Sequence, residues 1–101
     1  MTNYNKLVRD KIPEILDAKG ISYEKRIASP EEYKEELIKK LGEECEEFLQ
    51  SSVPEELADI IEVIDALKKL PEYSAVEMVR KEKLEERGGF EKRIILKGQK
   101  D

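Results

Sequence analysis

The sequence has no histidine and a single cysteine, Cys45. Without histidine, the chain cannot form Ser/His or Cys/His nucleophilic pairs, histidine zinc sites or the Glu-x-x-His pattern of di-iron bundles. One cysteine cannot form an internal disulfide, so a reducing compartment is expected. Any chemistry must therefore depend on carboxylates, lysine, arginine, tyrosine or a bound metal.

Long apolar runs are also absent. No stretch approaches the roughly 20 apolar residues that a membrane span needs, and residues 1–16 contain no apolar core of signal-peptide length. The net charge is -5, and its distribution argues against nucleic-acid binding by a broad basic face. We therefore expect a soluble, cytoplasmic protein that binds neither membrane nor nucleic acid, with one domain over residues 1–101.

Basic residues are missing from the segment between Leu41 and Leu67, although it holds nine of the chain's 24 carboxylates. Like charges three or four residues apart destabilise a helix by about 0.2–0.5 kcal/mol per pair. The other 74 residues carry 15 acids against 19 bases. This distribution favours a site that gathers a divalent cation, Mg²⁺ or its substitute Mn²⁺, and presents it to an anionic ligand.

Capping residues and apolar periodicity predict an all-α helical bundle of about four helices. Ser29, Pro30 and Glu32 form a capping-box pattern, and Pro54 suits the start of the next helix. Two segments, 21–27 and 90–96, show the alternation of short strands and could pair as a two-stranded β ribbon. The predicted helices cover residues 13–19, 30–50, 54–70 and 74–87.

The predicted helix 54–70 is apolar on nearly all sides. Such a helix belongs at the centre of an assembly, and a four-helix chain has difficulty covering it. We therefore expect a homo-oligomer, a dimer or a tetramer, with helix faces as the interface.

Helical geometry groups four of the carboxylates. Glu44 and Glu47 share one face of the second helix, and Glu56 and Asp59 share one face of the third. An antiparallel pair of helices would bring these two faces together as a cage for one or two Mg²⁺ ions. By spacing alone, a solvated acidic face is an equal alternative. Asp59 weighs against it, because an unpaired carboxylate within Leu-Ala-Asp-Ile-Ile needs a cation or a proton.

Three sequence motifs resemble the MazG-like all-α nucleoside triphosphate pyrophosphohydrolases. Residues 40–48 and 56–59 match the pattern Glu-Glu-x-x-Glu, a gap, then Glu-x-x-Asp. Residues 4–15 and 87–94 are similar to the opening and closing motifs of one small MazG-like subfamily. Together the motifs extend from residue 4 to residue 94 of the chain.

The resemblance implies Mg²⁺-dependent hydrolysis between the α and β phosphates of a nucleoside triphosphate, in the role of nucleotide-pool house-cleaning. It places the metal ligands at Glu44, Glu47, Glu56 and Asp59. Glu43 matches the first acid of the motif and would support the ligands or activate the attacking water, a role that Glu47 could also fill.

Phosphate contacts should come from basic residues in the two terminal motifs, and arginine suits them because its planar fork binds phosphate through two hydrogen bonds. Arg9 and Arg93 are preferred, whereas surface charge is the commoner role for residues such as Lys11 and Lys92. Tyr4, Tyr23 and Phe90 could stack on a base or simply anchor the core. The candidate substrate-binding residues are Lys6, Arg9, Lys11, Arg87, Lys92 and Arg93.

Two alternatives remain open. Phosphoribosyl-ATP pyrophosphohydrolase uses the same scaffold and cleaves the same bond, and a non-catalytic helical regulatory or interaction protein could carry similar acidic helices. Base and sugar preference depend on pocket shape and do not follow from the motifs.

Overall fold

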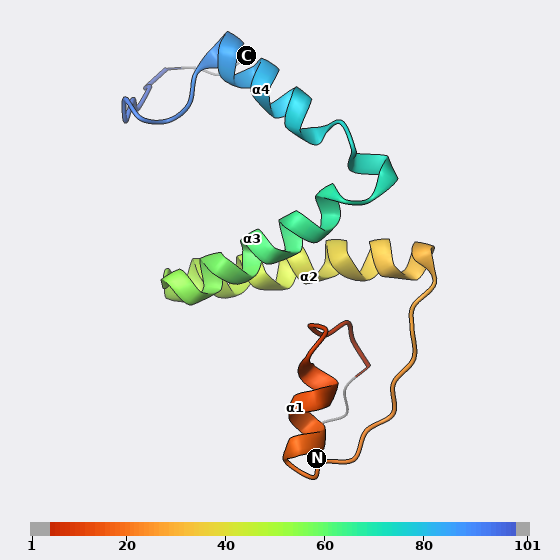
Figure 1. The fold of residues 1–101 in the computed structure, drawn as a ribbon. Coiled ribbons are helices and arrows are strands. Elements are labelled where there is room, and N and C mark those ends of the chain that lie inside the picture. The colour runs from red at the N-terminus through yellow and green to blue at the C-terminus, as the bar shows by residue number, and fades with distance from the viewer. Residues whose placement is uncertain (1–4, 99–101) are drawn as a thin grey trace.

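The computed structural model describes residues 5–98, and within that range the chain is all-helical (Figure 1). This confirms the predicted all-α class and the number of helices. The elements are α1 (Ile12–Ala18), α2 (Pro30–Ser51), α3 (Pro54–Lys68), the 3-10 turn η1 (Pro71–Tyr73) and α4 (Val76–Arg87).

The start of α2 follows the predicted capping chemistry. The hydroxyl of Ser29 accepts a hydrogen bond from the backbone N–H of Glu32 at 3.2 Å, and Pro30 occupies the first turn. This bond satisfies one of the backbone donors that the first turn of a helix leaves free. The Glu32 carboxylate instead accepts two hydrogen bonds from Arg26, at 2.5 and 2.6 Å.

A two-residue turn, Ser52 and Val53, joins α2 to α3. Ser52 adopts a left-handed conformation with φ of 56°, and its N–H donates to the carbonyl of Phe48 at 2.7 Å. This geometry ends α2 and reverses the chain, so that α3 begins at Pro54 and runs back along α2. Figure 1 shows the resulting hairpin at the centre of the molecule.

The core lies between α2 and α3. The buried apolar side chains among residues 5–98 are Leu37 on α2, and Ile60 and Val63 on α3. Leu37 belongs to an apolar stripe along α2, and the other members of that stripe are half-buried: Tyr33, Leu41, Cys45 and Phe48. The hairpin is therefore the part of the chain that positions side chains most firmly.

The two outer helices contribute little to this core. No residue of α1 is buried, and every residue of α4 is exposed. In Figure 1, α1 and α4 lie on opposite sides of the hairpin. No helix within residues 5–98 is long and apolar enough to cross a membrane.

The predicted β ribbon is wrong, since residues 21–27 and 90–96 form no strand. Arg93 interrupts the second segment with a left-handed φ of 57°, and its N–H donates to the carbonyl of Phe90 at 3.2 Å, which closes a turn. The two segments also lie at opposite ends of the molecule (Figure 1). An isolated two-stranded ribbon is marginal in water, and here neither segment meets a partner.

Candidate metal centre

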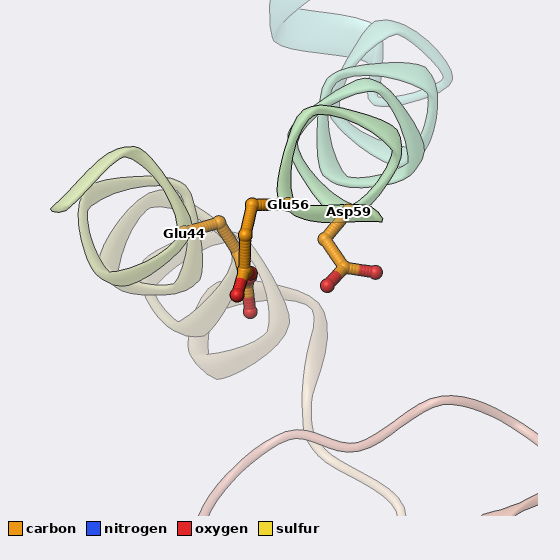
Figure 2. Close-up of side chains that lie close together, drawn as sticks. All are labelled: Glu44, Glu56 and Asp59. Atoms are coloured by element: carbon orange, nitrogen blue, oxygen red, sulfur yellow. The ribbon is translucent and has the colours of Figure 1, made fainter. Parts of the chain in front are cut away.

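Three carboxylates converge where α2 and α3 face each other. Glu44 comes from α2, and Glu56 and Asp59 come from successive turns of α3 (Figure 2). One oxygen from each residue lies within 4.8 Å of the others. The helical spacing of the α3 pair and the antiparallel direction of the hairpin produce this arrangement. We refer to these three residues as the carboxylate cluster.

Glu44 is the buried member of the cluster. The residue is only 8% exposed, and its Oε2 atom has no hydrogen-bond partner. The other oxygen, Oε1, lies 3.8 Å from Nζ of Lys40, one turn earlier on α2. A buried acceptor without a partner costs about 1–3 kcal/mol, and more when it is charged. Glu44 therefore requires either a cation or a proton.

The pKa of Glu44 also shows that its surroundings disfavour the ionised form. Burial raises it above its ordinary value, the negative charges of Glu47 and Asp59 raise it further, and Lys40 lowers it in part. Loss of solvent contact and neighbouring like charges both disfavour the ionised carboxylate. A divalent cation would reverse this balance, because it favours ionisation of all the carboxylates around it.

Glu47 lies beside the cluster. Its carboxylate raises the pKa of Glu44, and it also raises the pKa of Glu56, where partial desolvation is the larger cause. Glu47 is exposed and is not one of the three residues whose oxygens meet within 4.8 Å. The structure thus brings three of the four predicted ligands together and places the fourth at their edge.

Asp59 meets a cation from a distant part of the chain. Its Oδ1 atom lies 2.7 Å from Nη2 of Arg9, which precedes α1. The sequence led us to expect that Asp59 needs a cation or a proton, and in the structure the guanidinium of Arg9 supplies the positive charge. Local sequence pattern could not reveal this pair, because 50 residues separate the two side chains.

The remaining candidates lie outside the cluster. The Glu43 side chain is exposed and makes no hydrogen bond or ion pair within residues 5–98, and Lys6 and Lys11 are exposed at the start of the chain. Three further basic candidates are exposed on or after α4 and are not brought to the carboxylates: Arg87, Lys92 and Arg93.

The structure describes two of the three aromatic candidates, Tyr23 and Phe90. The hydroxyl of Tyr23 donates to Asp17 at 2.8 Å, which ties this side chain to α1. Phe90 is 97% exposed, and Tyr4 lies outside the described residues. The positions of Tyr23 and Phe90 therefore give no support for base recognition by these two side chains.

The ligand atoms of the carboxylate cluster limit the kinds of metal ion that it could bind. All of its ligand atoms are carboxylate oxygens, which suit hard cations such as Mg²⁺, Mn²⁺ and Ca²⁺. Comparison with family models, curated proteins and solved structures gave no match. Assignment of an activity therefore depends on the cluster and on the motifs around it.

Proposed function

We propose that this protein is a divalent-metal-dependent nucleoside triphosphate pyrophosphohydrolase of the MazG-like type. The observation that carries the proposal is the buried, unpartnered Oε2 of Glu44 within a cluster of three carboxylates. Such an atom is expected where a cation completes the site. The motif resemblance supplies the reaction, and nucleotide-pool house-cleaning is the role proposed for it.

In the proposed reaction, water attacks the α phosphorus of the nucleotide. A bond forms between the water oxygen and that phosphorus, and the bond to the bridging oxygen of the β phosphate breaks. The products are the nucleoside monophosphate and pyrophosphate, with the proton of water passing to a base. No covalent enzyme intermediate is needed, which agrees with the absence of histidine.

The carboxylate cluster is the proposed binding site for Mg²⁺, with Glu47 as an additional ligand at its edge. When bound, the ion would lower the pKa of water and offset negative charge on the phosphate oxygens. Mn²⁺ accepts the same oxygen ligands and should substitute for it. The residues fit this role because Glu44 lacks a partner for Oε2 and the cluster contains no competing nitrogen or sulfur ligand.

Glu47 is the better candidate for the general base. Its carboxylate lies close enough to Glu44 and Glu56 to perturb both pKa values, whereas Glu43 has no comparable interaction. An exposed carboxylate at the edge of the cluster can receive a proton from water and pass it to solvent. Glu43 is then left with a supporting role in the proposed site.

Arg9 is the best-placed phosphate ligand among the basic candidates. One of its amino groups binds Asp59, and a guanidinium carries five N–H donors in a planar fork. The donors that do not face Asp59 can therefore hold a phosphate oxygen beside the cluster. Lys6, Lys11, Arg87, Lys92 and Arg93 are candidates from the motif resemblance alone.

A pyrophosphate-release screen tests the proposal. Wild-type protein with Mg²⁺ is assayed against canonical nucleotides, damaged nucleotides and phosphoribosyl-ATP, next to Asp59→Asn and Glu46→Gln. Glu46 is an exposed α2 carboxylate, so its variant is the matched control. We expect release by wild type and Glu46→Gln and a loss of roughly 10–100-fold in Asp59→Asn, which removes the charge of a proposed ligand. A wild type that releases no pyrophosphate from any substrate would instead favour a non-catalytic interaction protein.

A further inference from the structure

Lys40 is a basic residue beside the carboxylate cluster that has no part in the proposed function as described so far. It lies on α2, one turn before Glu44, and its Nζ atom is 3.8 Å from Oε1 of that residue. The Lys40 side chain is only 23% exposed, whereas the neighbouring Lys39 is exposed. A lysine usually buries its stem and keeps its ammonium group in water. Here the ammonium group lies next to a buried carboxylate instead.

Helix stabilisation alone does not account for this contact. A glutamate four residues before a lysine stabilises a helix better than a lysine four residues before a glutamate. Glu36 precedes Lys40 by four residues and offers the better order, yet within residues 5–98 Lys40 forms its ion pair with Glu44. The ammonium group therefore lies toward the cluster, although a better-ordered partner is present one turn earlier on the helix.

The contact balances charge but leaves hydrogen-bonding capacity unused. A distance of 3.8 Å is too long for a hydrogen bond, which needs about 2.7–3.2 Å. The ammonium group of Lys40 makes no hydrogen bond within residues 5–98, and Oε2 of Glu44 has no partner either. Arg9 differs, because it donates to Asp59 at 2.7 Å. Lys40 and Glu44 thus place an unused donor group beside an unused acceptor.

A metal ion that carries a phosphate group would satisfy both residues. The metal ion would bind a carboxylate oxygen of Glu44, and phosphate oxygens would accept hydrogen bonds from the N–H donors of Lys40. A free metal ion would satisfy only Glu44, and the neighbouring ammonium charge would repel it. The two residues together therefore favour a metal–phosphate complex over the metal ion alone.

We propose that Lys40 is a phosphate ligand of the carboxylate cluster, and that it makes the cluster bind a metal–phosphate complex in preference to the free divalent cation. The proposal rests on the proposed function only in that the cluster binds a divalent cation. Arg9 contacts Asp59 of α3 and Lys40 contacts Glu44 of α2, so a basic side chain accompanies a carboxylate of each helix.

Calorimetric titration at pH 8 with two probes tests the proposal: Mn²⁺ alone, and the Mn²⁺ complex of inorganic pyrophosphate. Lys40→Met keeps an apolar stem and removes the ammonium group. It should bind Mn²⁺ alone as tightly as wild type or up to about fivefold more tightly, because a repulsive charge is lost. Its affinity for the pyrophosphate complex should fall by at least about tenfold, because a hydrogen bond to a charged group is lost.

Lys39→Met is the matched control, because Lys39 is exposed and directly precedes Lys40 on the same helix. It should leave both affinities unchanged. Lys40→Arg retains a positive charge and N–H donors, so it should preserve most of the preference for the complex. Circular dichroism verifies that each variant is folded, and Lys40→Gln replaces Lys40→Met if the latter does not fold.

Three results would overturn the proposal. The first is an unchanged affinity of Lys40→Met for the pyrophosphate complex, and the second is a wild type that binds this complex no more tightly than Mn²⁺ alone. The third is an equal loss of affinity for both probes, which would mean that Lys40 only holds Glu44 in place. The titrations involve no hydrolysis, so a wild type that fails the pyrophosphate-release screen contradicts the proposed function without deciding the role of Lys40.

Discussion

The guanidinium of Arg9 lies 2.7 Å from Oδ1 of Asp59, and this contact joins the segment before α1 to the carboxylate cluster. Both side chains keep solvent contact, at 58% and 39% exposure, so the pair itself contributes at most about 1 kcal/mol. Its importance lies in its position. Arg9 and a divalent cation would both be drawn to the same carboxylate.

Replacement of Arg9 by Gln is predicted to separate metal binding from nucleotide binding. Loss of the competing positive charge should tighten Mn²⁺ binding by up to about fivefold, the factor equivalent to roughly 1 kcal/mol. Loss of a phosphate ligand should raise KM for the nucleotide. Calorimetric titration with Mn²⁺ and steady-state pyrophosphate release measure the two effects.

Arg26→Gln is the control, because Arg26 forms its ion pair with Glu32, away from the cluster. Weaker Mn²⁺ binding in Arg9→Gln would contradict the competition.

The stability of the metal-free protein is predicted to fall as pH rises, and Glu44→Gln should reduce that fall. The pKa values of Glu44 and Glu56 are raised in the folded chain, so both groups bind protons more tightly there than in the unfolded chain. The protonated groups therefore stabilise the folded chain, and this stabilisation is complete below the ordinary pKa of 4.5. It is lost as the pH rises through the pKa values that the two groups have in the folded chain.

Thermal or urea unfolding between pH 4.5 and 8 in a chelator measures this effect. At pH 8, Glu44→Gln is expected to be about 1 kcal/mol more stable than wild type, because it removes a buried and unpartnered charge. Glu32 and Glu77 have lowered pKa values, so their contributions change below 4.5 and do not account for a decline above it. Mg²⁺ should stabilise wild type increasingly as pH rises. An equal pH dependence in the two proteins would exclude Glu44 as its source.

Glu47→Gln and Glu43→Gln are predicted to differ in kcat. A general base is typically worth about 10²–10⁴ in rate, so Glu47→Gln should lower kcat by at least 100-fold. Glu43→Gln should lower it by less than about tenfold, because the Glu43 side chain is exposed and makes no hydrogen bond or ion pair within residues 5–98. Pyrophosphate release at saturating nucleotide and Mg²⁺ gives both values. The reverse order would assign the base to Glu43.

Local signals in the sequence were sufficient to predict the hairpin. Ser29 and Pro30 mark the start of α2, Pro54 marks the start of α3, and helical periodicity places Glu44 opposite Glu56 and Asp59. Each of these features depends on residues a few positions apart. The expected ends of these two helices accordingly agree with the structure to within two residues.

Features that depend on distant residues were harder to predict. Alternating residues in 21–27 and 90–96 indicate strands only if a partner strand is present, and the turn at Arg93 prevents an extended segment. The Arg9 and Asp59 contact joins residues 50 positions apart and has no local signature. The exposure of α4 also depends on where its neighbours lie.

The two-residue turn at Ser52 and Val53 has a consequence for the order of folding. All three carboxylates of the cluster lie within 16 consecutive residues, from Glu44 to Asp59, so the site assembles by closing one short loop. Loops of this size close in well under a microsecond, and local contacts of this kind form faster than distant ones. We therefore expect the acidic side chains to meet before α1 and α4 reach their places, and a cation bound at that stage would stabilise the hairpin.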